Sequence, residues 1–292
     1  MAGGRAAEHT GRIMIATASP RSPKRRSHAH PAPPSKVLQL LELRALGELG
    51  VSFALLPLLR RAPRGDGHPV LVLPGLLASD TSTQLLRAYL TDRGYAAHGW
   101  GLGRNLGLKP GLESKMLERL RELHGEHGRK VSVVGWSLGG VYAREIASAM
   151  PEAVRSVITL GSPIRGNPKS TNAWRVYQWA SGQSVDGPGA RRLREAAPPV
   201  PTTSIYSRSD GIVAWQTSVE RTTAATESIE VIGSHCGLGV NAAALYAIAD
   251  RLAQPEGEWR PFERSGLRSL VFPDPGRGAD AAAPASLRHA DC

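Results

Sequence analysis

The pentapeptide GWSLG at residues 135–139 places Ser137 between two glycines, directly after the apolar run at residues 131–134. A helix-like sequence follows it. A serine on such a sharp strand-to-helix turn has its hydroxyl lifted clear of the sheet, and glycines beside it avoid collisions. The N–H of Leu138, at the start of the helix, would then face an oxygen that becomes negative during attack. The pattern indicates a nucleophilic serine.

A serine hydroxyl is a weak nucleophile and needs a base, together with an acid that orients the base. With this kind of turn, the acid and the histidine follow the serine along the chain, each after a strand. Asp210 follows the strand-like residues 202–207, and His235 follows residues 228–233. We therefore predict a triad of Ser137, Asp210 and His235, which requires no metal or organic cofactor.

Other interpretations exist for these residues. An isolated Asp-Gly, as at Asp210, is usually an ordinary turn, and a lone histidine is usually structural. Asp186 is an alternative acid, but no predicted strand precedes it. Cys236 adjoins His235 and is expected to be a packed small residue, because nothing in the sequence would activate its thiol.

Stabilising an oxyanion requires a second N–H, supplied by the loop after the first strand. Here that loop is LPGLLASD, residues 73–80. Gly75 permits a close backbone approach, so Leu76 is the expected donor and Leu77 the alternative. Pro-Gly is also common loop punctuation, which is the competing interpretation.

Strands and helices alternate from residue 68 onward, and the strands are rich in Val, Ile and Leu. This predicts an α/β fold with a mostly parallel sheet and helices on both faces. The expected strands are residues 68–75, 95–100, 130–135, 154–161, 202–207 and 228–233. The expected helices are residues 82–94, 111–128, 138–150 and 237–254.

Residues 162–202 are too long for a simple crossover and predict a short lid-like insertion that forms a pocket wall. The aromatic residues within it favour an apolar acyl or lipid-like substrate. Residues 99–107, GWGLGRNLG, are a further pocket segment, unless their glycines only shape a turn. The candidate pocket residues are Leu77, Trp136, Trp174 and Trp179.

Length and charge suggest one domain, residues 62–272, with tails. The chain has 292 residues and a formal net charge of +11, and residues 1–36 hold seven Lys or Arg against one acid. We interpret residues 1–36 as a disordered basic leader, either solvated or an arm for anionic lipid or nucleic acid; translation starting at Met14 would remove part of it. Residues 273–292 are predicted to be a disordered tail. We expect no specific binding to nucleic acid.

Residues 37–61 predict an amphipathic helix. Their longest uncharged run, residues 49–59, is far shorter than the ~20 residues that span a bilayer. We expect the apolar stripe to pack on the domain, with a membrane surface as the alternative. The first thirty residues lack the apolar core of a secretory signal, and two cysteines suggest a reducing compartment. We therefore expect a cytoplasmic protein, with peripheral contact at the inner membrane surface as the alternative.

Between residues 68 and 254 the chain resembles the α/β-hydrolase superfamily, and within it bacterial esterases and triacylglycerol-lipase-like proteins. The segments that carry the resemblance are VLVLPG, GWSLGG, LGSPIRG, SDGIV and SHCGLG. Trp136 stands where many lipases have His before the serine, and Ile164 where they often have His. Pro74-Gly75 stands where many of them have His-Gly.

The resemblance and the triad together imply a serine esterase or lipase that forms an acyl-enzyme on a small ester or a lipid. Acyl transfer by the same triad is one alternative function. A non-catalytic binding protein on a hydrolase fold is the other, because a fold alone does not establish activity.

Overall fold

The structure is a computed structural model that describes residues 31–185 and 196–274. The leader up to residue 30, the end of the chain from residue 275 and the alternative acid Asp186 lie outside the described residues. The remainder of the insertion predicted at residues 162–202 lies within them.

A single parallel sheet, ordered β2-β1-β3-β4-β5-β6, forms the centre of the described part of the chain. Its strands are β1 (Pro69–Leu73), β2 (Ala96–Gly99), β3 (Val131–Trp136), β4 (Val154–Leu160), β5 (Thr202–Tyr206) and β6 (Thr226–Glu230). The chain starts at β1, adds β2 on one side, and then adds all later strands on the other. Because the strands are parallel, the loops that follow them gather at one edge of the sheet. The predicted fold class is confirmed.

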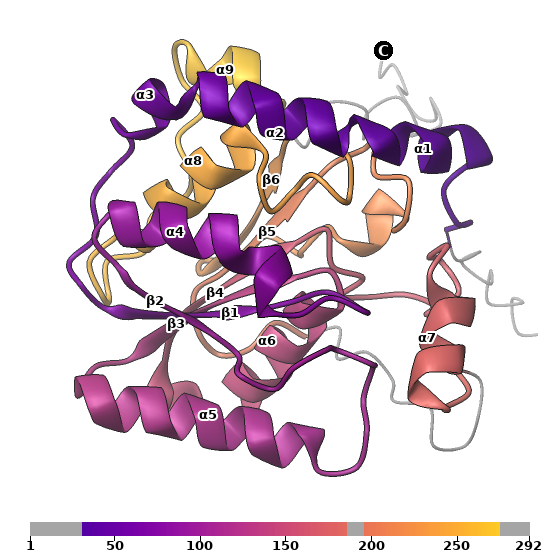
Figure 1. Ribbon diagram of the computed structural model, residues 1–292. Helices are drawn as coiled ribbons and strands as arrows, with labels where there is room; N and C mark the ends of the chain where they lie inside the picture. Colours follow the sequence, from indigo (N-terminus) through magenta and orange to yellow (C-terminus); the bar gives the residue numbers. More distant parts are fainter. Residues whose placement is uncertain (1–30, 186–195, 275–292) are drawn as a thin grey trace, which may run out of the picture.

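Helices cover both faces of this sheet (Figure 1). Helices α5 and α6 pack on one face, and α4 and α8 on the other, where α2 and α3 contact α8. The helices are α1 (Lys36–Leu40), α2 (Ala45–Ala54), α3 (Leu56–Leu59), α4 (Gln84–Asp92), α5 (Leu112–His127), α6 (Leu138–Ala149), α7 (Trp174–Ser181), α8 (Ala242–Leu252) and α9 (Arg268–Val271). Short 3-10 helices are η1 (Leu41–Arg44), η2 (Asp80–Thr83), η3 (Pro151–Ala153) and η4 (Trp215–Thr217).

Strand β1 shows why the strands read as continuous apolar runs. Val70 and Val72 pack into the core beneath α4 and α8, whereas Leu71 and Leu73 pack into the core beneath α5 and α6. All of them are buried, because successive side chains point to opposite faces and both faces are covered.

Two elements near the histidine differ from the expected ranges. Strand β6 begins two residues earlier than predicted and ends at Glu230. The following helix starts only after Asn241, whose side chain accepts hydrogen bonds from Ala243 N and Ala244 N as its N-cap. Residues 231–240 therefore form a loop instead of parts of a strand and a helix.

The N-terminal segment is helical but is divided into α1, η1, α2 and α3. Its orientation differs from the expected one, because the polar side faces the domain. Glu42 is buried, and Glu48 is 14% exposed in its side chain, whereas Leu43 and Leu46 are 79% and 78% exposed. The expectation that the apolar stripe packs on the domain holds for α3, whose Leu59 is buried in the core beneath α4 and α8, and is wrong for the exposed leucines of α1, η1 and α2. None of the described helices has both the length and the apolar character needed to cross a bilayer.

Candidate active site

Ser137 lies in the turn between β3 and α6 with φ 53° and ψ −120°, a conformation that side chains rarely adopt. The turn is so tight that a Cβ on Gly135 would come within 2.3 Å of the Gly139 oxygen. A Cβ on Gly139 would come within 2.3 Å of the Leu73 oxygen. Both glycines are therefore required by close backbone contacts, as the motif predicts.

His235 stands between Ser137 and Asp210. Its Nε2 is 3.0 Å from Ser137 Oγ, and its Nδ1 is 2.6 Å from Asp210 Oδ2. A carboxylate can only accept, so Nδ1 carries the hydrogen and Nε2 presents its lone pair to the serine hydroxyl. The structure thus brings together the three residues that the sequence singled out, from loops after β3, β5 and β6.

The Asp210 carboxylate has a fixed direction. Its other oxygen, Oδ1, accepts hydrogen bonds from Ile212 N at 2.8 Å and Val213 N at 2.7 Å. Burial lowers the pKa of His235, but the charge and hydrogen bond of Asp210, with the charge of Glu42, raise that pKa above its ordinary value overall. The imidazolium form is therefore favoured by two carboxylates.

Two residues that line the pocket together with Ser137 have backbone N–H groups available to an oxyanion. Leu138 is the first residue of α6, so its N–H has no acceptor within the helix. The Leu76 N–H has no hydrogen-bond partner among residues 31–185 and 196–274, and both residues line the pocket at Ser137. Leu77 N, by contrast, donates to Asn105 O at 2.7 Å, which rules out Leu77 as the alternative donor.

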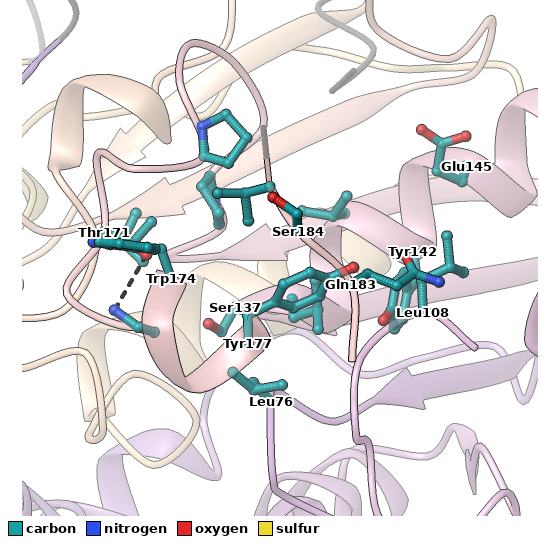
Figure 2. Close-up of a pocket in the computed structure, with 17 residues that line it drawn as sticks. Leu76, Leu108, Ser137, Tyr142, Glu145, Thr171, Trp174, Tyr177, Gln183 and Ser184 are labelled. Carbon is teal, nitrogen blue, oxygen red and sulfur yellow. Dashed lines mark hydrogen bonds between the residues drawn. The ribbon is translucent and has the colours of Figure 1, made fainter. Parts of the chain in front are cut away.

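A mostly apolar pocket of about 130 Å³ opens at Ser137. Figure 2 shows Ser137 and Leu76 near Trp174 and Tyr177, which come from α7. The predicted insertion supplies much of the wall, including Trp174, Tyr177 and Gln183 to Val185. The arrangement can hold an apolar group beside the serine.

Three of the predicted pocket residues do not line this pocket. Trp179 is 79% exposed on the outer side of α7. Trp136 donates through Nε1 to His235 O at 3.1 Å, so it supports the histidine loop instead. Leu77 also lies outside the lining, with its backbone at φ 61°. Only Trp174 of the four is in the wall, because one face of α7 points into the pocket. Cys236, expected to be packed, is exposed.

Sequence reasoning missed two polar residues at the site. Asn105 is fully buried; its Nδ2 donates to Pro74 O at 2.9 Å and its Oδ1 accepts from Gly107 N at 3.1 Å. Glu42 accepts hydrogen bonds from the backbone of the histidine loop. No local motif marks either residue, although Asn105 lies in the segment 99–107 that was expected to touch the pocket.

The opposite edge of the sheet holds a second group of the same three residue types. His68 Nδ1 is 2.5 Å from Asp66 Oδ1, and His68 Nε2 is 2.9 Å from Ser132 Oγ. His68 and Ser132 are buried, and Ser132 also shares a hydrogen bond with Ser156 Oγ at 3.0 Å. His68 is fully buried and Ser132 is 1% exposed, so this group joins strands inside the core.

Within the described ranges, no three His, Cys, Asp or Glu side chains converge as a metal site requires. The chain matches no family model and none of the curated proteins.

Solved structures give weak similarities. A thioesterase domain from the curacin biosynthetic pathway is 18% identical with a TM-score of 0.44, over 64% of this chain and 93% of that chain. Aspergillus fumigatus lipase B is 17% identical with a TM-score of 0.48, over 65% of this chain and 53% of that chain. Naproxen esterase from Bacillus subtilis is 16% identical with a TM-score of 0.44, over 65% of this chain and 85% of that chain.

Proposed function

We propose that this chain is a serine hydrolase of the α/β-hydrolase type, acting on carboxylic esters through an acyl-enzyme. The single observation that carries the proposal is the continuous contact from Ser137 Oγ through His235 to Asp210 Oδ2. It occurs at the mouth of a pocket and beside unpaired N–H groups. A binding protein would have no need for a strained serine backbone at this position.

In the proposed reaction, Ser137 Oγ attacks the acyl carbon while His235 Nε2 takes its proton. Asp210 holds the imidazole in this tautomer and stabilises the imidazolium. The N–H groups of Leu76 and Leu138 bind the oxyanion, each worth roughly 2.7–4 kcal/mol in comparable sites. His235 then protonates the leaving alcohol, and water enters the same cycle to release the acid.

The residues that line the pocket support an apolar acyl group as its occupant. Its wall contains Leu108, Val141 and Val213 in addition to the aromatic residues of α7. Burying hydrocarbon there releases about 0.8 kcal/mol for each methylene. We therefore assign the pocket to the acyl chain of the ester.

Labelling with a fluorophosphonate tests the proposal. We expect the full-length protein to be labelled, and Ser137→Ala to lose all labelling. Ser132→Ala is the matched control, because Ser132 also contacts a histidine that contacts an aspartate but is only 1% exposed. Absence of labelling in the wild type, or equal labelling of the Ser137 variant, would refute the proposal.

Hydrolysis and acyl transfer share every step up to the acyl-enzyme, so labelling does not separate them. Quantifying the free acid and the new ester formed from p-nitrophenyl esters of graded length, with and without added alcohols, does. Under the proposal, free acid is the main product, and added alcohol yields at most a minor share of new ester.

A further inference from the structure

The helical segment from Lys36 to Leu59 shows an inverted polarity. Its two acids, Glu42 and Glu48, face the domain and bind backbone groups there. Arg44 also points inward, donating to Ser209 O at 2.7 Å and Gly233 O at 2.9 Å. Amphipathic helices usually expose their charged side chains to solvent, but these three bind groups of the domain instead.

The outer side of the same segment is apolar. In Figure 1, α1 and α2 lie across the top of the molecule. Side chains exposed there by between 55% and 79% are Val37, Leu40, Leu43, Leu46, Val51, Phe53 and Leu58. Contiguous apolar surfaces of this kind mark sites that contact another molecule or a membrane.

Basic residues lie at both ends of this apolar surface. Lys36 precedes it, Arg60 and Arg61 follow it, and all three are exposed, although Arg60 also lies 3.8 Å from the Asp92 carboxylate. Residues 1–30, which precede α1 in the sequence with residues 31–35 between them, contain six Lys or Arg and one acid. Residues 186–195 and 275–292 contain one leucine each and no Ile, Val, Phe or Trp, so they are poorly suited to cover it.

We propose that the outer face of α1 and α2 docks into the interface of an anionic lipid bilayer. The leucines enter the boundary between headgroups and acyl chains, and the basic residues on either side contact lipid phosphates. Such docking combines an apolar anchor with an electrostatic one, each of which alone would bind weakly. It is independent of the hydrolase reaction.

Sedimentation of the full-length protein with vesicles tests the proposal. One set of vesicles contains phosphatidylcholine alone, and the other contains phosphatidylcholine mixed with phosphatidylglycerol. We expect binding to the mixed vesicles that weakens as salt is added. The variant Leu43→Ser/Leu46→Ser should bind them about tenfold or more weakly. Lys24→Glu/Arg25→Glu/Arg26→Glu should lose the preference for phosphatidylglycerol.

The matched control is Val176→Ser/Trp179→Ser, which changes two apolar side chains exposed by 40% and 79% on α7, away from α2 (Figure 1). It should bind like the wild type. Equal losses in both double variants, or no sedimentation of the wild type with mixed vesicles, would overturn the proposal. A dimer in solution that Leu43→Ser/Leu46→Ser dissociates, without lipid binding, would assign the surface to a second copy of the chain instead.

The inner side of the segment has a separate role. Glu42 Oε1 accepts hydrogen bonds from Gly211 N at 2.7 Å and His235 N at 2.9 Å, and Oε2 accepts one from Cys236 N at 2.8 Å. One carboxylate thus joins the loop after β5 to the loop after β6. Hydrogen bonds to a charged acceptor are about twice as strong as neutral ones.

Glu42 is also ionised at this position. Burial opposes its ionisation, but the three N–H groups and the nearby His235 lower the pKa of the carboxyl below its ordinary value. A fixed negative charge therefore lies behind the histidine. The other groups that contact the imidazole are the Asp210 carboxylate at Nδ1 and the neutral Ser137 hydroxyl at Nε2. Two further charged side chains bind the same loop: Glu48 accepts from Ser234 N at 2.7 Å, and Arg44 donates to Gly233 O at 2.9 Å.

We infer that Glu42 is a positioning residue for His235 in the function proposed above. It fixes the backbone on both sides of the Asp210–His235 contact, and its charge favours the imidazolium that forms during attack. The N-terminal segment then belongs to the catalytic apparatus although it lies 193 residues from the histidine in sequence.

Comparing Glu42→Gln with Glu48→Gln tests this role. Glu42→Gln keeps the shape but replaces one acceptor oxygen by an amide group facing Cys236 N. We expect the fluorophosphonate labelling rate to fall about tenfold or more, and the midpoint of its pH dependence to move to lower pH. Glu48→Gln, which removes a bond to the same loop without touching His235, should leave that midpoint unchanged.

Titration of His235 by NMR in the Ser137→Ala background measures the effect of Glu42 without any activity. A lower pKa for His235 in Glu42→Gln is expected there too. An unchanged pKa and labelling rate would overturn the inference about Glu42. Absence of labelling in the wild type would instead count against the proposed hydrolase, and the NMR result would still stand.

Discussion

The backbone N–H of Leu77 donates a hydrogen bond to the backbone oxygen of Asn105 at 2.7 Å. Asn105 N in turn donates to Ala78 O at 2.8 Å, so the loop after β1 is tied to the loop after β2. The bond withdraws one N–H from the site and leaves the preceding one, of Leu76, as the candidate donor to an oxyanion. The position of the proposed oxyanion donor is therefore set from a second loop.

Asn105→Ala should loosen this tie. It removes the side-chain bonds to Pro74 O and Gly107 N and leaves the Pro74 carbonyl without its donor. We expect kcat on a p-nitrophenyl ester to fall roughly 10- to 100-fold, because a misplaced Leu76 N–H loses much of the stabilisation worth 10²–10³ in rate. KM should change little. A lower denaturation midpoint with an unchanged kcat would show that Asn105 serves only the fold.

The two tryptophans of the insertion should behave differently. Trp174 lines the pocket, whereas Trp179 is 79% exposed. Trp174→Ala should lower kcat/KM for an octanoate ester about tenfold relative to an acetate ester, because lost apolar contact is worth about 1–3 kcal/mol. Trp179→Ala should leave the ratio of the octanoate kcat/KM to the acetate kcat/KM unchanged. Equal chain-length profiles for the two variants would contradict the assignment of the pocket to the acyl chain.

The activity should depend on pH through His235. The histidine must be neutral to take the serine proton, and its pKa is raised by Asp210 and Glu42 despite the opposing effect of burial. The acid limb of kcat/KM should therefore have its midpoint above about 6.5, the ordinary value for histidine. A midpoint below that value would contradict the charge arrangement.

The raised pKa of His235 also affects the stability of the fold, which should fall with rising pH while the activity increases. A histidine whose pKa is raised in the folded state stabilises that state fully below its unfolded pKa, and this contribution disappears as the pH rises through the folded pKa. The free energy of unfolding, compared with that of His235→Ala, should thus decline across the pH range in which activity rises.

Local patterns were sufficient for the elements that carry the triad. The turn at Ser137 is dictated by its own glycines, and the buried strands before Asp210 and His235 are recognisable from their apolar residues. Strand β6 was predicted two residues late, because the apolar Val231 and Ile232 continue the pattern of the strand. Side-chain capping by Asn241 then delays the helix beyond its glycine-rich start.

The contacts that support the triad are long-range, and no sequence pattern within a single segment predicts them. Glu42 is 169 residues from Gly211, and its carboxylate is needed there because loop N–H groups at the strand ends lack partners. That need also explains the wrong orientation predicted for the N-terminal helix. Pairing of buried N–H groups with Glu42 and Glu48 directs the polar side inward, and the apolar stripe is left outside.

The strained backbone of Ser137 should make the site costly for stability. At φ 53° a side chain is strained by about 1–3 kcal/mol, and glycine is not. We therefore expect Ser137→Gly to unfold in urea with a free energy about 1 kcal/mol or more above that of Ser137→Ala. Both variants should be inactive, because neither has the nucleophile.

Ser79 provides the control for this comparison. Its backbone is extended, with φ −137° and ψ −174°, so it carries no such strain. There the order should reverse, with Ser79→Gly less stable than Ser79→Ala by about 0.4–1 kcal/mol, since glycine makes the unfolded chain more flexible. The same order at both positions would mean that the turn at Ser137 stores no strain.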